Sequence, residues 1–171
     1  VGNPSTVLQT EEATLVFVDG NRRFYVVDPK APSDLSADSE EFVASPDGTR
    51  RVAVGGGQIL FVTESGALFA APVESPESHF PINPDGDVKV AEGETPPVYL
   101  ADDAAITPDA VVVAVQQVGP SESRLIVADA STGKTLSDQT LEMTLGDGAQ
   151  VAQVDGKWVV LNGVDGLLWV E

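Results

Sequence analysis

The apolar residues of this chain occur in short runs that are rich in valine and bounded by Gly, Pro, Asp, Asn and Ser. Apolar spacing typical of an amphipathic helix is almost absent, and the longest run, Ala110–Val115, has the length of a strand. The pattern therefore predicts an all-β fold of many short strands. The clearest strands are expected at Leu15–Val18, Arg23–Val27, Glu41–Ala44, Arg51–Val54, Gln58–Thr63, Ala67–Val73, Val111–Val118, Arg124–Ala128, Lys157–Leu161 and Leu167–Val170.

Shorter or more polar segments predict further strands, and most connections are short, so sequential strands should pair as antiparallel hairpins. Two segments rich in Pro, Ser and acidic residues, Pro29–Ser39 and Glu74–Pro97, are expected to be long loops. The chain should contain at most one short helix, within these loops. The further strands are expected at Val7–Thr10, Asp87–Val90, Val98–Leu100, Lys134–Leu141 and Gln150–Val154.

A turn motif repeats along the chain. Asp-Gly precedes a strand at Asp19-Gly20, Asp47-Gly48 and Asp155-Gly156, and Asp109-Ala110 occupies a similar place. The average spacing is about 45 residues, and a unit of that size with three or four antiparallel strands is typical of a β-propeller blade.

We therefore expect one propeller-like domain over 1–171, with units near 7–40, 41–75, 87–142 and 148–171. The sequence leaves two arrangements open. Val7–Thr10 completes the last unit and closes a four-bladed ring, or the chain is an incomplete, open arc of a larger propeller.

The charge of the chain is strongly negative, with 27 acidic against 9 basic residues and a formal net charge of −18. Such a field repels nucleic acid and anionic bilayers, so neither is expected as a partner. No apolar run approaches the ~20 residues that a membrane-spanning helix needs, so this segment should not insert into a membrane. The acidic excess is otherwise explained by solubility.

Cysteine is absent, which excludes disulfides, zinc–thiolate sites, iron–sulfur clusters and cysteine nucleophiles. Residues 128–135 match a relaxed phosphate-loop pattern ending Gly133-Lys134-Thr135, but no helix signal follows, so a hairpin turn is expected there. The single histidine, His79, is expected to be an exposed loop residue, because no nucleophile motif accompanies it.

Three groups of residues are candidate binding sites. Asp85 and Asp87 lie in an Asn-Pro-Asp-Gly-Asp turn whose oxygens suit Ca²⁺, although the order does not match an EF-hand loop. Two arginine pairs, Arg22-Arg23 and Arg50-Arg51, could line a shared anion site if adjacent units bring them together. Because neighbouring residues in a strand face opposite ways, only one arginine of each pair is expected on a given face. The alternative is that the arginines neutralise nearby acids.

Trp158 and Trp169 are expected to pack between units rather than to form a ligand platform.

The turns Ser45–Gly48, Asp129–Lys134 and Asp165–Trp169 resemble blade hairpins of quinoprotein-like and WD40-like propellers. Val7-Leu8-Gln9 followed by Val26-Val27-Asp28-Pro29 resembles the N-terminal repeat region of large actinobacterial surface proteins. That resemblance implies a membrane anchor before this region, fibronectin type III repeats after it, and no catalytic residues. Quinoprotein dehydrogenases hold their cofactor with a stacking Trp, calcium ligands and often a vicinal disulfide, so the lack of cysteine argues against an enzyme of that branch.

We therefore expect a non-enzymatic interaction or scaffold module, extracellular or at a bacterial cell surface, that belongs to a longer protein. Its expected partner is a protein or a cell-surface glycan, and an open arc would also self-associate through its exposed strand edges. No cofactor is expected, although Ca²⁺ could bind. The alternative is a ligand- or cation-sensing propeller, and a third hypothesis is a carboxylate-based hydrolase or lyase.

Overall fold

The structure, a computed structural model, describes residues 4–10, 14–18, 23–27, 43–82, 99–146, 149–162 and 166–171. Within these residues the chain forms strands and one short 3₁₀ helix, η1 (Pro76–Ser78). The strands are β1 (Pro4–Gln9), β2 (Thr14–Val18), β3 (Arg23–Val27), β4 (Val43–Ala44), β5 (Thr49–Gly55), β6 (Gln58–Thr63), β7 (Leu68–Pro72), β8 (Phe80–Pro81), β9 (Asp103–Ile106), β10 (Val111–Gly119), β11 (Glu122–Asp129), β12 (Thr135–Leu141), β13 (Gln150–Val154), β14 (Lys157–Asn162) and β15 (Leu167–Val170).

The strands form four antiparallel meanders in chain order. The first sheet is β1–β4, the second β5–β8, the third β9–β12 and the fourth β13–β15. Within each sheet, each strand pairs antiparallel with the next one along the chain, and most of these pairs are joined by short connections. The prediction of an all-β antiparallel meander fold is confirmed.

The second and third sheets are covered on both faces, and their sequences show why. Along β10, Val112 and Ala114 belong to one hydrophobic cluster, whereas Val113 and Val115 belong to another. Because alternate residues of a strand point to opposite faces, a continuous apolar run such as Ala110–Val115 needs a neighbouring sheet on each side. Alternate residues of β6 likewise belong to two hydrophobic clusters, one shared with the first sheet and the other with the third sheet.

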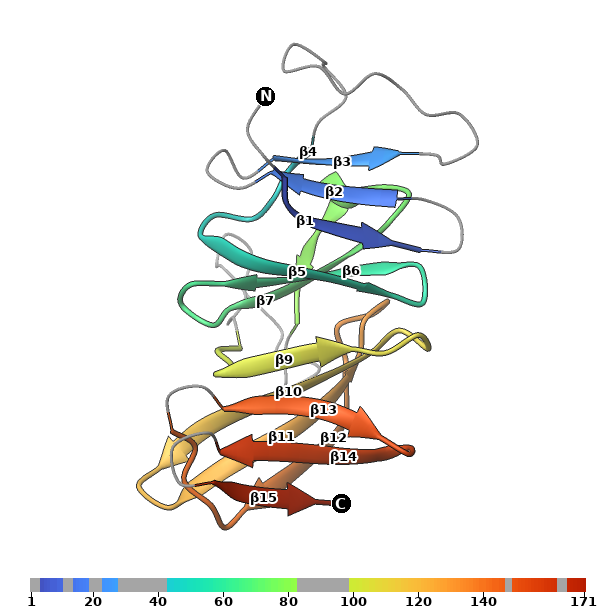
Figure 1. Cartoon of the computed structure of the whole chain (residues 1–171). Helices are drawn as coiled ribbons and strands as arrows, with labels where there is room; N and C mark the ends of the chain where they lie inside the picture. Colours follow the sequence, from blue (N-terminus) through green and yellow to red (C-terminus); the bar gives the residue numbers. More distant parts are fainter. Residues whose placement is uncertain are drawn as a thin grey trace, which may run out of the picture.

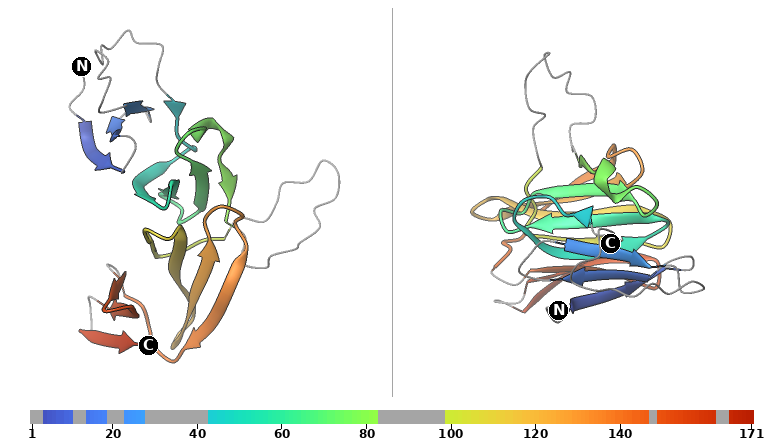
Figure 2. Two further views of the ribbon diagram at one scale, coloured as in Figure 1. Left: turned by 90° about the vertical axis from the view of Figure 1, so that its right-hand side faces the viewer. Right: turned by 90° about the horizontal axis from the view of Figure 1, so that it is seen from above.

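The four sheets stack side by side in an arc. The first strand of each sheet contacts the first strand of the next, through β1, β5, β9 and β13 in succession. Figure 1 shows the sheets following one another along the stack, and Figure 2 shows the arc with the first and fourth sheets at opposite ends. Trp158 and Trp169 pack against the cluster between the third and fourth sheets, as predicted.

Two glycines allow the second and third sheets to approach closely. Gly66, at φ +88°, lies in the turn between β6 and β7, and its carbonyl accepts a 2.7 Å hydrogen bond from the Ala101 amide. A Cβ on Gly66 would lie 2.4 Å from the Ala101 oxygen. Gly56, in the β5–β6 turn, would meet the Ala110 amide at 2.4 Å. Any larger residue would therefore force the two sheets apart.

The structure corrects two details of the predicted elements. A strand was expected at Val98–Leu100, but Leu100 forms only an isolated bridge with Ala67, and the strand begins at Asp103. The segment Glu74–Pro97 was expected to be a loop throughout, yet it contains η1 and β8. The two missed strands, β8 and β9, are short and contain Pro or a charged residue, so they carry little apolar pattern.

The Asp-Gly repeat also does not mark equivalent turns. Asp155-Gly156 joins two strands of one sheet, whereas Asp47-Gly48 connects β4 to β5, in different sheets. β1 pairs with β2 in the first sheet and, in the part of the chain described, with no strand of the fourth, so Val7–Thr10 does not complete the last unit. The described residues contain no helix with the length and apolarity needed to cross a membrane.

Candidate functional site

The structure describes only part of the predicted binding residues. Arg22, Asp85 and Asp87 lie outside the described residues, so the calcium turn stays a prediction. Arg23 is half-buried at the start of β3, the third strand of the first sheet. Arg50 and Arg51 lie near the start of β5, the first strand of the second sheet, so the two pairs occupy different strand positions. Anion binding by the arginines stays a prediction.

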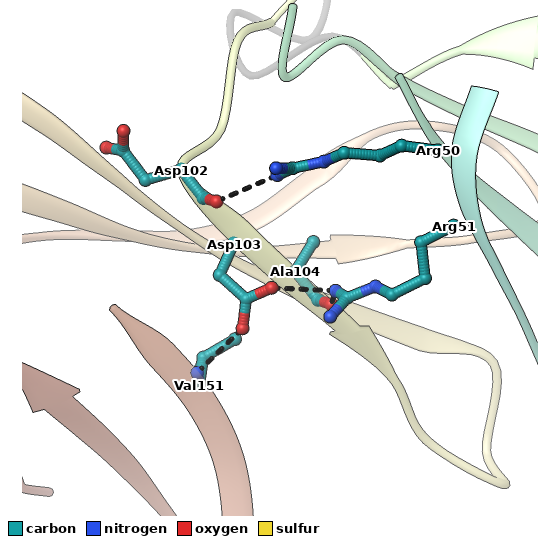
Figure 3. Close-up of polar contacts among 6 residues, drawn as sticks. All are labelled: Arg50, Arg51, Asp102, Asp103, Ala104 and Val151. Carbon is teal, nitrogen blue, oxygen red and sulfur yellow. Dashed lines mark hydrogen bonds and ion pairs between the residues drawn. The ribbon is translucent and has the colours of Figure 1, made fainter. Parts of the chain in front are cut away.

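A β-bulge places Arg50 and Arg51 on the same side of β5. In the β5–β6 ladder Thr49 pairs with Thr63 and Arg51 with Val62, which leaves Arg50 as an extra residue. An extra residue in one strand interrupts the alternation of side chains. The expectation that the two arginines face opposite ways is therefore wrong, and Figure 3 shows both side chains extending towards the third sheet.

The two arginines bind the third sheet, Arg50 just before its first strand β9 and Arg51 within that strand. Nη2 of Arg50 donates a 3.0 Å hydrogen bond to the Asp102 carbonyl oxygen. Nη2 of Arg51 lies 2.8 Å from Oδ1 of Asp103 and also donates to the Ala104 carbonyl oxygen. Guanidinium groups suit this role because their donors form a rigid planar fork.

Asp103 extends the contact to the fourth sheet. Its second oxygen, Oδ2, accepts a 3.0 Å hydrogen bond from the Val151 amide at the start of β13 (Figure 3). Asp103 is only 8% exposed, and each of its carboxylate oxygens has a polar partner, as a buried carboxylate requires. We call Arg51, Asp103 and the Val151 amide the three-sheet clamp, because it joins the first strands of three consecutive sheets.

A cleft lies beside the clamp. Its volume is about 750 Å³, and its walls come from the second, third and fourth sheets and the segment before β13. Arg50 and Asp102 are exposed at this cleft, and the Asp102 carboxylate accepts a 2.5 Å hydrogen bond from the Gln117 amide. Two arginines face two aspartates here, so the local charge is balanced although the chain is strongly acidic. The lining residues are Arg50, Arg51, Asp102, Asp103, Leu145, Gly146, Ala149, Gln150, Val151 and Ala152.

The phosphate-loop pattern lies in the turn between β11 and β12, as predicted. Lys134 is followed by strand β12 rather than by a helix, so no helix N-terminus faces the turn. The Asp129 carboxylate accepts hydrogen bonds from the Ser131 hydroxyl and amide and from the Thr132 amide. The hydrogen bond from the Ser131 side chain is the main reason that the pKa of Asp129 lies below its usual value. The amides that a phosphate would need are thus taken by a carboxylate.

We expect millimolar Mg-ATP to leave the melting temperature of this chain unchanged. A ligand present at 100 times its Kd would add about 2.7 kcal/mol to the free energy of unfolding, which thermal melting detects easily. An upward shift that disappears in Lys134→Ala would show instead that the turn binds nucleotide.

His79 is exposed between η1 and β8, as predicted. Its imidazole makes edge contacts with the rings of Phe69 and Phe61, at centroid distances of 5.8 Å and 6.2 Å. These contacts fix the ring against the second sheet. Within the ranges that the structure describes, no group of three or more His, Cys, Asp or Glu side chains could hold a metal ion.

Comparisons with solved structures decide the fold. The β-propeller domain of Cps50 (Swd1) from Myceliophteria thermophila matches 93% of this chain with a TM-score of 0.57 at 11% identity. BamB from Moraxella catarrhalis matches 96% with a TM-score of 0.52 at 12% identity. The fold is that of a β-propeller. The computationally designed Ika4 protein also matches, over 99% of this chain and 91% of its own, with a TM-score of 0.57 at 12% identity.

The propeller arc of this chain spans about half the length of the two natural chains, 48% of BamB and 50% of the Swd1 domain. No family model matches the sequence. No curated protein matches it significantly either.

Asp102 and Asp103 were not among the residues selected from the sequence. The available signal is a pair of acids directly before a short apolar run, Ala104–Ile106, about one repeat after Arg50-Arg51. Their role became visible only when the propeller arrangement placed the first strands of successive sheets side by side.

Proposed function

We propose that this chain is a non-catalytic scaffold or interaction module of a bacterial cell-surface protein, which presents a rigid surface to a protein or glycan partner. β-Propellers in general serve as scaffolds for protein interaction. Here the observation that carries the proposal is the three-sheet clamp. It uses the charged groups beside the cleft to hold the sheets in fixed positions, rather than leaving them for chemistry.

A ligand-sensing propeller is the second candidate, because of one observation. The cleft beside the clamp is large enough for a small ligand, and Arg50 and Asp102 are exposed at it. Under this alternative, an anionic or zwitterionic ligand would bind Arg50 at the cleft, and the sheets would tighten around it.

Protease treatment of intact cells tests the surface location. We expect trypsin added to living cells of the producing organism to remove the antibody epitope of this chain from the cells, while a cytoplasmic control protein stays intact. Retention of the epitope until the cells are lysed would contradict the proposal. In a separate experiment on the purified chain, a rise in its melting temperature with malonate or Ca²⁺ would favour the sensing alternative.

A further inference from the structure

The fourth sheet has an uncovered apolar face. Val160, Trp158 and Trp169 face the third sheet, so the residues that alternate with them along β14 and β15 face away from it. Four of those five residues are apolar, namely Val159, Leu161, Leu168 and Val170. Three of the four are exposed to water: Leu168 is 60%, Val170 49% and Leu161 37% exposed. The fifth, Lys157, lies at the end of β14 opposite Val154. The ladder places Val159 opposite Val170 and Leu161 opposite Leu168, so the outward residues form one continuous surface. Val154 on β13, 55% exposed, lies on the same face.

This composition is that of a sheet with a neighbour on both sides. An antiparallel sheet with one face in water normally alternates apolar and polar residues, whereas β6 and β10 of this chain are apolar on both faces and packed on both. β14 also carries apolar residues on both of its faces, but among the described residues only one of these faces is packed against another sheet. In the part of the chain described, the other three sheets have four strands and the fourth sheet has three, with β15 as its last strand.

Charge does not oppose a neighbour at this face. The charged residues among the described part of the fourth sheet and its turns are Asp155, Lys157 and Glu171, so the acidic excess of the chain lies elsewhere. A neighbouring sheet could therefore dock there without bringing many like charges together.

The size of the face favours a neighbour in the same polypeptide over a second copy. Three strands of about five residues present a face of roughly 14 by 17 Å, or about 240 Å². Stable association between separate proteins usually buries about 800 Å² per partner. A tethered sheet needs less contact because its effective concentration is high. In addition, BamB and the Cps50 (Swd1) propeller domain are each about twice the length of this chain.

We propose that the outward face of the fourth sheet packs against a further antiparallel propeller sheet supplied by the same polypeptide. Leu161, Leu168 and Val170 then form the centre of that interface. This inference does not depend on the function proposed above.

The test compares two leucines that are equally exposed here. Leu168 is 60% exposed on the uncovered face, and Leu136 is 61% exposed on β12, so Leu136→Ala is the matched control for Leu168→Ala. In the 171-residue chain both variants should melt within about 1 °C of each other, because neither leucine is buried. In the polypeptide as its gene encodes it, we expect Leu168→Ala to melt about 4 °C below Leu136→Ala.

Three results would overturn the proposal. Equal melting temperatures of the two variants in the encoded polypeptide would show that Leu168 stays uncovered. If the gene encodes no residues beyond this chain, the same polypeptide has no further sheet that could cover the face. A stable dimer of the 171-residue chain in sedimentation, lost in Leu168→Ala but not in Leu136→Ala, would identify a second copy as the neighbour.

Discussion

Gly66→Ala should lower the free energy of unfolding by at least about 3 kcal/mol, because two costs add at this position. The φ of +88° is unfavourable for any residue with a Cβ, which costs about 1–2 kcal/mol. The new methyl group would also lie 2.4 Å from the Ala101 carbonyl oxygen, which belongs to the backbone and cannot swing away. Relieving that clash stretches the hydrogen bond between the Ala101 amide and the Gly66 carbonyl. Thermal and urea unfolding measure the loss.

Gly156→Ala is the matched control. Gly156 has a similar φ of +77° in the β13–β14 turn, but a Cβ there would have no atom within 4 Å. Only the conformational cost of about 1–2 kcal/mol should remain. Equal losses in the two variants would mean that Gly66 does not set the distance between the second and third sheets.

Asp103→Ala should cost about 2–3 kcal/mol, or roughly 5–8 °C in melting temperature. The larger share comes from the buried Val151 amide, which loses its acceptor. The ion pair with Arg51 contributes less, because the Arg51 side chain is 45% exposed and solvent screens it. Hydrogen exchange should also show faster exchange of the Val151 amide.

Asp138→Ala provides the comparison for an exposed ion pair. Asp138 pairs with Arg124 between β12 and β11, where both side chains are well exposed to water. We expect a loss of less than about 1 kcal/mol. A loss as large as that of Asp103→Ala would contradict the distinction between a surface pair and the three-sheet clamp.

Most of the fold could be predicted from the sequence, because the strands that carry it are apolar. Val111–Val115 and Ile59–Val62 are apolar runs without helical spacing, and both lie in strands of the two middle sheets. β8 and β9 could not be found in this way. Phe80–Pro81 is too short to show a pattern, and Asp103–Ile106 begins with a charged residue whose partners lie on other sheets.

The candidate site was less predictable, because it depends on a local irregularity. Strand alternation assigned Arg50 and Arg51 to opposite faces, and one bulged residue brought them to the same side. The partner of Arg51 is 52 residues away in sequence at Asp103, and only the stacking of the sheets brings the two together. Short-range patterns contain no information about such a contact.

The stacking of sheets in chain order has a consequence for how the molecule comes apart. Among the described residues, the main contacts of each sheet are with its neighbours in the series, so the chain behaves like a short linear array rather than a closed globule. Interior units of such an array are held on two sides and terminal units on one, and opening should therefore begin at the ends and progress inward. The two middle sheets are the natural nucleus for assembly, and loss of a terminal sheet would leave them folded.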